Sequence, residues 1–235
     1  MSLSATGRRR VAIMQPTYLP YLGYFELIAQ SDLFVFLDDV QFERRSWQSR
    51  NRILGPTGEL MLTVPVKKHA QDTMLREIRV SEDQPWREKH LATIRHVYAG
   101  RPHLSEVIDL LEGALQVPAR LSNLNFAIIA SAAARMGLTT PMTMASAMNC
   151  GGRRSQHLLN ICRTAGATEY LSPTGSREYL EADAVFAGAK LPIRYFAHQP
   201  KPYAQGKPEF TPYMAFIDAV ANLGWEGTAA LLDRG

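Results

Sequence analysis

Short, nearly continuous apolar runs alternate along this chain with longer segments in which apolar residues recur every three or four positions. The short runs are typical of strands buried on both faces of a parallel sheet, and the 3.6-residue period is typical of helices with one buried face. The runs that predict strands are residues 11–14, 33–37, 60–66, 142–145, 169–171 and 193–196. The segments that predict helices are residues 23–30, 86–98, 104–115, 121–136, 155–165 and 214–223.

The order of these segments predicts an α/β fold. The first strand, helix and strand form a unit of the kind that builds a parallel sheet covered on both faces. Three predicted helices then follow one another directly, which indicates a helical insertion at residues 84–138. We therefore predict a Rossmann-like, mostly parallel sheet in a single domain of residues 11–235. Residues 1–10 are polar and then basic, and we expect them to form a flexible N-terminal arm.

Composition and charge narrow the class of protein. The formal net charge of +4 over 235 residues is compatible with an anionic small-molecule substrate, and it allows nucleic acid without requiring it. Cys150 and Cys162 lie in no zinc-ligand pattern, which favours reduced thiols. No segment reaches the roughly 18 apolar residues of a membrane span. We therefore expect a soluble, cytoplasmic protein without a membrane span.

The loop after the first strand supplies the first candidate site residues. Gln15 and Pro16 follow the strand, and Tyr18, Tyr21 and Gly23 lead into the helix. The tyrosines offer flat faces and hydroxyls. Gly23 would let an anion approach the unpaired N–H groups of the helix N-terminus. The alternative interpretation is a rigid turn whose tyrosines pack in the core.

Two carboxylates end the second strand. Asp38 and Asp39 lie where parallel sheets place their ligands, and either could contact a ribose hydroxyl, a metal or a substrate amine. Successive strand residues point to opposite faces, so at most one of the two is expected to face the site. The alternative role is helix capping. Together with Tyr18 they are the candidate catalytic residues, and without a surrounding ligand pattern we predict no dedicated metal site.

The polar segment beyond these carboxylates combines arginines with an aromatic ring. Arginine binds phosphate or carboxylate through two parallel hydrogen bonds, and tryptophan offers a stacking surface. A later Ser- and Gly-containing loop, residues 172–177, could hold an anion through backbone N–H groups. The alternatives are a solvated charge run and an ordinary turn. The candidate binding residues in these regions are Arg44, Trp47, Arg50, Asn51, Arg52, Lys67, Ser172 and Gly175.

The spacing of the first loop resembles the phosphate loop of HxGH-type nucleotidyltransferases and of pantothenate synthetase. In those proteins HxGH opens a helix between two strands, and the matching tetrad here is Tyr21-Leu22-Gly23-Tyr24. A tyrosine with its ordinary pKa near 10 is neutral at pH 7 and cannot replace the imidazolium that steadies a pentavalent phosphate. The resemblance therefore implies a shared architecture, with a site for ATP or a nucleotide sugar, while adenylyl transfer lacks its usual cation.

A second resemblance covers nearly the whole chain, from residue 11 to about residue 224. The blocks that carry it are QPTYLPYLGYFELIAQSDLFVFLDDVQFERRSWQSRNRI, LTVPV, ATEYLSPTGSREYL and the C-terminal segment from Tyr203 to Gly224. They resemble the WbqC-like proteins of bacterial surface-polysaccharide and related gene clusters. This resemblance implies an accessory biosynthetic enzyme that modifies a sugar or another small metabolite.

Together the two resemblances imply transfer of an acyl or aminoacyl group to an amine, for example on an amino sugar. In this hypothesis Arg50 and Arg52 hold the anionic part of the donor, and Asp39 orients or deprotonates the amine. Gly23 lets the helix N-terminus meet a phosphate or carboxylate. An aminoacyl-tRNA is one donor that the positive charge allows. The alternative hypothesis is a non-catalytic protein that binds a nucleotide, a nucleotide sugar or RNA.

Overall fold

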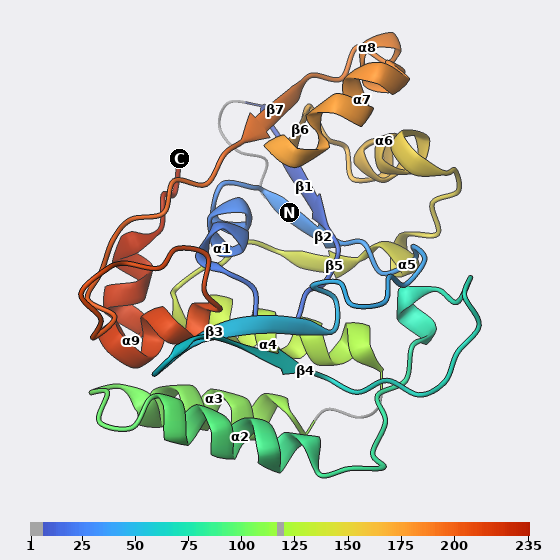
Figure 1. The fold of residues 1–235 in the computed structure, drawn as a ribbon. Coiled ribbons are helices and arrows are strands. Elements are labelled where there is room, and N and C mark those ends of the chain that lie inside the picture. The colour runs from blue at the N-terminus through green and yellow to red at the C-terminus, as the bar shows by residue number, and fades with distance from the viewer. Residues whose placement is uncertain (1–6, 117–119) are drawn as a thin grey trace.

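A five-stranded parallel sheet forms the centre of the computed structural model, which describes residues 7–116 and 120–235 (Figure 1). The strand order is β5-β2-β1-β6-β7, and every neighbouring pair is parallel. This order confirms the predicted Rossmann-like, mostly parallel α/β fold. The strands are β1 Arg10–Met14, β2 Leu33–Phe36, β5 Met142–Met144, β6 Glu169–Pro173 and β7 Ile193–Phe196.

Both faces of the sheet are buried because alternate strand residues enter two separate cores. Ala12, Phe34 and Phe36 face a large core, and Val11 and Val35 face a smaller one. The strands therefore need apolar residues at consecutive positions, which explains their unbroken apolar runs. The helices of the large core include α1 Leu22–Ala29, α4 Leu121–Arg135 and α9 Phe216–Leu231. Those of the smaller core are α6 Arg154–Thr164, α7 Arg177–Asp183 and α8 Val185–Gly188.

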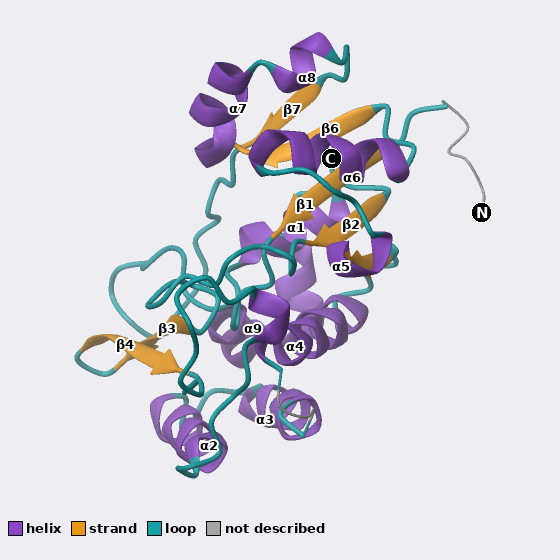
Figure 2. Ribbon diagram, turned by 90° about the vertical axis from the view of Figure 1, so that its right-hand side faces the viewer, coloured by secondary structure: helices purple, strands orange, loops and turns teal. Residues whose placement is uncertain are grey.

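The connection from β2 to β5 contains the predicted helical insertion and also an antiparallel hairpin. Figure 2 shows both on one side of the sheet, opposite α6, α7 and α8. The large core extends into this insertion without a break. The additional elements are β3 Arg50–Gly55, β4 Gly58–Thr63, the 3-10 turn η1 Leu75–Glu77, α2 Trp86–Val97 and α3 Leu104–Ala114.

The strand predicted at residues 60–66 does not belong to the main sheet. It lies in β4, which ends at Thr63 and pairs with β3 alone. Along β4 only Leu62 is buried, so this strand packs through a single side chain. The central strands, in contrast, are buried on both faces. The polar segment that begins at Arg50 is its partner strand, which the sequence pattern did not indicate.

The C-terminal third differs from the prediction in three places. Thr174–Ser176 form a 3-10 turn, η2, and the short helices α7 and α8 follow where no helix was predicted. Gly224, just after the predicted helix of residues 214–223, interrupts α9 with φ 71, but helix resumes beyond it to Leu231.

Strand β1 begins at Arg10, and the backbone N–H of Arg9 donates to Thr168 Oγ1 at 2.8 Å.

Residues 1–6 of the predicted N-terminal arm lie outside the described residues. Within residues 7–116 and 120–235, no helix is both long enough and apolar enough to cross a lipid bilayer.

Candidate functional site

The loop after β1 is fixed to β3 by one buried side chain. Asn51 Nδ2 donates to the backbone carbonyls of Tyr18 and Leu19 at 3.1 and 2.8 Å. Its Oδ1 accepts the backbone N–H of Arg52 at 2.8 Å. These bonds hold Leu19 at φ 45, a left-handed conformation that is costly for a branched side chain. Asn51 therefore shapes the floor of the loop, and its amide group is used by the protein itself.

A second buried amide ties the same loop to the insertion. Asn125 on α4 donates to the carbonyls of Pro16 and Gln48 at 2.9 and 2.8 Å. Gln48 Nε2 in turn donates to Gln15 Oε1 at 2.8 Å, and Tyr24 Oη donates to the Gln15 carbonyl. The sequence analysis missed Asn125 and Gln48. An amide on the apolar face of a predicted helix was the available signal for Asn125.

An aromatic cavity of about 320 Å³ opens at the carboxyl end of β1, beside the start of α1. Its volume lies in the range of small-molecule sites. The Arg52 Cζ atom lies 5.9 Å from the centroid of the Trp47 ring, and Arg52 Nη1 pairs with Glu59 at 2.9 Å. The aromatic cavity is lined by Met14, Thr17, Pro20, Tyr21, Tyr24, Trp47, Asn51, Arg52 and Tyr213.

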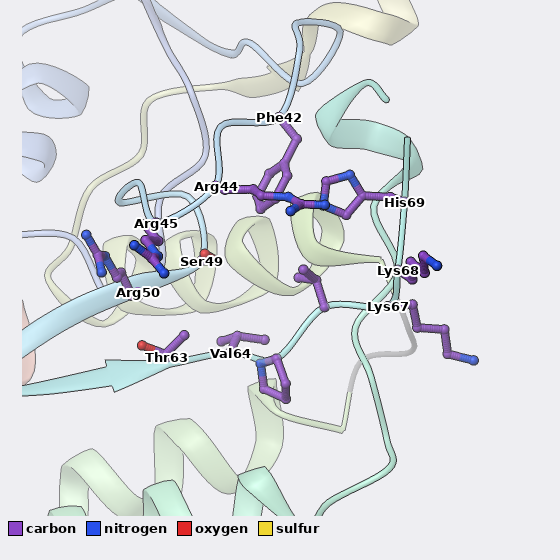
Figure 3. A pocket seen from close by; sticks show the side chains of 12 residues that line it. Phe42, Arg44, Arg45, Ser49, Arg50, Thr63, Val64, Lys67, Lys68 and His69 are labelled. Carbon is purple, nitrogen blue, oxygen red and sulfur yellow. The ribbon is translucent and has the colours of Figure 1, made fainter. Parts of the chain in front are cut away.

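A basic groove of about 270 Å³ lies next to the start of β3 (Figure 3). Its cations come from two segments, the loop before β3 and the chain after β4. We define the basic groove by Phe42, Arg44, Arg45, Ser49, Arg50, Thr63, Val64, Pro65, Val66, Lys67, Lys68 and His69.

The strand β3 joins these two cavities. Arg50 and Arg52 lie two residues apart on it, so their side chains leave the same face about 7 Å apart. Arg50 lines the basic groove, and Arg52 lines the aromatic cavity. The structure thus places Tyr21, Trp47, Asn51 and Arg52 in one cavity, and Arg44, Arg50 and Lys67 in its neighbour.

Neither aspartate after β2 lies in the lining of the aromatic cavity or the basic groove. Asp38 is only 3% exposed and accepts the backbone N–H and the hydroxyl of Ser146, at 2.9 and 2.6 Å. Ser146 lies in the first turn of α5, Ala145–Met148, so Asp38 acts as a helix cap. Asp39 faces the other way and pairs with His157 of α6.

The Asp39–His157 pair is partly buried and favours the charged imidazole. His157 Nε2 lies 3.0 Å from Asp39 Oδ1, and its Nδ1 lies 3.2 Å from the carbonyl of Gly151. The Asp39 carboxylate and the Gly151 carbonyl both accept hydrogen bonds, so each ring nitrogen has an acceptor when both nitrogens are protonated. The hydrogen bond that the ring donates to Asp39 is the main cause that raises the pKa of His157. Sequence reasoning missed this partner, which lies 118 residues away from Asp39.

Tyr18, a candidate catalytic residue, is a core residue. Its side chain has no exposed surface, and its hydroxyl lies 2.9 Å from His90 Nδ1. Burial raises the pKa of Tyr18, and burial lowers the pKa of His90 to about 4. The two rings therefore form a neutral hydrogen-bonded pair beneath the loop.

The space at Gly23 is occupied by protein side chains. A Cβ atom there would lie 2.4 Å from Tyr21 Cε2 and 2.7 Å from His198 Cγ. Glycine is therefore required for the packing of these rings, and a ligand does not reach the helix N-terminus through this point. At the end of β6, Ser172 is fully buried and Gly175 is exposed, and neither lines the aromatic cavity or the basic groove.

A buried Glu26–His198 pair supports the wall of the aromatic cavity. His198 Nδ1 lies 2.7 Å from Glu26 Oε2, and the two side chains are 8% and 3% exposed. The imidazole packs edge-on against Tyr21 and Tyr213, which both line the aromatic cavity. The sequence pattern gives His198 no role, because it does not show that Glu26 lies next to the ring. The available signal was an acidic residue on the apolar face of the first helix.

Comparison with known proteins agrees with the resemblance seen in the sequence. The model of the WbqC-like protein family matches residues 15–230, which include the whole lining of the basic groove and, except for Met14, that of the aromatic cavity. The uncharacterized protein Rv1507c of Mycobacterium tuberculosis is 30% identical over 222 residues, covering 93% of this chain and 95% of that protein. The extent of the family match leads to one conclusion. This chain belongs to the WbqC-like protein family.

Proposed function

We propose that this protein is a small-molecule biosynthetic enzyme that transfers an acyl or aminoacyl group to an amine. The observation that carries the proposal is the position of β3, which supplies Arg52 to the aromatic cavity and Arg50 to the basic groove. An enzyme that joins two substrates needs two neighbouring sites. One of these sites is suited to a ring and the other to an anion.

The acceptor amine is assigned to the aromatic cavity. The rings of Tyr21, Trp47 and Tyr213 offer faces against which a sugar or another ring can pack. Thr17 adds a hydroxyl for a polar substituent of that ring. The cavity volume suits a substrate of this size, such as an amino sugar.

The donor is assigned to the side of β3 where Arg50 and Arg52 project together. The acceptor nitrogen forms a bond to the acyl carbon, the bond from that carbon to its leaving group breaks, and the amine proton leaves to solvent. A guanidinium close to the leaving group, which departs as a thiolate from an acyl-coenzyme A and as an oxyanion from an aminoacyl ester, stabilises the negative charge that develops there. We assign no proton transfer to Asp39, because His157 holds it outside the lining of both cavities.

Amide formation is the direct test. The protein is incubated with a nucleotide sugar that bears a free amine, together with an acyl-coenzyme A, with ATP and a carboxylic acid, or with an aminoacyl-tRNA. Mass spectrometry should detect the amide with at least one donor. Arg52→Ala should lower the rate at least tenfold, whereas Arg163→Ala at an exposed position of α6 should not change it. Binding of these compounds without any amide product would reject the enzyme proposal.

The alternative function is non-catalytic binding of a nucleotide, a nucleotide sugar or RNA. It is favoured by the half-exposed Trp47 ring, which lies beside the arginines of the basic groove. Stacking surfaces next to cations are typical of single-stranded nucleic acid sites. A thermal-shift screen at two salt concentrations separates these ligands, because only RNA binding should weaken steeply with salt.

A further inference from the structure

The basic groove concentrates positive charge without balancing it. Five of its lining residues are permanent cations, and none of its lining residues is a carboxylate. Within residues 7–116 and 120–235, no Asp or Glu pairs with Arg44, Arg45, Arg50, Lys67 or Lys68. Like charges gathered in one groove without a counter-charge repel one another. An anion with several charges would remove this repulsion.

Arg50 is the half-buried member of the set. Its Nε atom is buried and has no hydrogen-bond acceptor in the described part of the chain. The other four cations are exposed and line the open sides of the basic groove. The groove thus places one half-buried guanidinium on β3 and four exposed cations around it, an arrangement that suits several charged oxygens in succession.

Neutral donors complete the lining. Ser49 and Thr63 contribute hydroxyls, and His69 packs edge-on against Phe42 with ring centroids 5.1 Å apart. His69 Nδ1 donates to the carbonyl of Ala70 at 2.8 Å, so Nε2 is an acceptor in the neutral ring, and the neutral donors are the two hydroxyls. Figure 3 shows His69 next to Arg44 and Phe42 in the groove.

We infer that the basic groove binds a chain of at least two phosphates carried by a nucleotide-type ligand. A single phosphate would leave most of the five cations unbalanced. The basic groove of about 270 Å³ shares Phe42, Arg44 and His69 with a further hollow of about 600 Å³. We favour a small ligand over a long RNA strand because the aromatic cavity on the other side of the groove has room for one ring. The ring of such a ligand would lie in the aromatic cavity, and its phosphates would extend from Arg52 to Arg50. The inference shares the aromatic cavity, Arg50 and Arg52 with the proposed function, in which this ligand would be the nucleotide-sugar acceptor, and it holds whether or not acyl transfer takes place.

Calorimetric titration with inorganic pyrophosphate and tripolyphosphate tests the inference in 0.1 M salt. Both probes should bind, and inorganic phosphate should bind at least tenfold more weakly. The double variant Arg50→Gln/Lys67→Gln should lower pyrophosphate affinity at least tenfold. The control Arg163→Gln/Arg194→Gln removes the same charge at two exposed residues outside the groove and should change affinity less than twofold.

Two outcomes would overturn the inference. Equal losses in both double variants would show only long-range attraction to a positive protein. Absence of pyrophosphate and tripolyphosphate binding, with tight binding of a single-stranded RNA oligomer, would make the groove an RNA site. If Arg50→Gln/Lys67→Gln does not fold, Arg44→Gln/Lys68→Gln gives the same test at exposed positions. Pyrophosphate binding without any amide product would reject the proposed reaction and leave the inference intact.

Discussion

Asn51 shows how one amide determines the shape of a candidate site. It satisfies the carbonyls of Tyr18 and Leu19 in a place that water does not reach. Asn51→Ala should lower the free energy of unfolding by about 2–4 kcal/mol, since two buried acceptors lose their donor. Urea denaturation measures this change. The control Gln156→Ala removes an exposed amide with one hydrogen bond and should cost less than about 0.5 kcal/mol. Similar costs for both variants would contradict the role of Asn51.

His90 should make the fold sensitive to acid. Burial lowers the pKa of His90 to about 4, whereas an unfolded histidine has a pKa near 6.5. Between these values the unfolded chain binds more protons, so stability falls as the pH drops from about 6.5 to 4. The loss attributable to this group is roughly 3 kcal/mol. Urea denaturation across this pH range should show a smaller loss in His90→Gln than in the wild-type protein, and equal losses would contradict the assignment.

His157 should act on stability in the opposite direction. Asp39 raises the pKa of His157, so this pair stabilises the fold fully below pH 6.5 and less as the pH rises through the raised value. Asp39→Asn removes the carboxylate charge and should lower the pKa of His157. Proton NMR of the ring follows the titration directly. The ring signals of exposed His96, which is not part of this pair, serve as the internal reference in the same spectra.

At the scale of elements, α1 is positioned by the close approach of aromatic rings to Gly23. Gly23→Ala would place its Cβ atom against Tyr21 and His198, which wall and support the aromatic cavity. We expect a loss of about 1–3 kcal/mol in the free energy of unfolding. In α3, Gly113 has open space at its Cβ position, so Gly113→Ala should instead stabilise by about 0.5–1 kcal/mol. Thermal denaturation of both variants tests the opposite signs.

The same scale explains what the sequence could predict. The central strands were recognisable because both of their faces are buried, which requires unbroken apolar runs. Strand β3 was not, because Arg50 and Arg52 alternate with buried residues and read as a polar segment. The loop after β1 and the arginine-rich segment that includes Arg50 and Arg52 were also recognisable, because both are rich in residues that can bind a ligand.

Which of these residues line the same cavity can be learned only from the tertiary structure. Only the pairing of β3 with β4 separates Arg50 from Arg52 into two cavities, and only the packing of α6 brings His157 to Asp39. The sequence predicts a catalytic role for Tyr18 and an anion site at Gly23, and it cannot show that His90 and His198 fill the space around them.

At the scale of the whole molecule, the helical insertion shares its core with the sheet. Leu111 on α3 belongs to the same buried cluster as Phe34 and Phe36 of β2. We therefore expect insertion and sheet to unfold as one cooperative unit, as the predicted single domain requires. Leu111→Ala should lower stability by about 2–5 kcal/mol through the cavity that it leaves.

Native-state hydrogen exchange measures how far this loss extends, because each amide reports the free energy of the opening that exposes it. In a single unit, the slowest amides of α3 and of β1 lose the same protection in Leu111→Ala. Ile161→Ala, in the core on the other face of the sheet, should produce the same uniform loss. If Leu111→Ala weakens only the amides of α2, α3 and α4, the insertion opens on its own and the chain holds two cooperative units. The shared core between Phe36 and Phe126, whose rings lie 5.1 Å apart, argues for the uniform result.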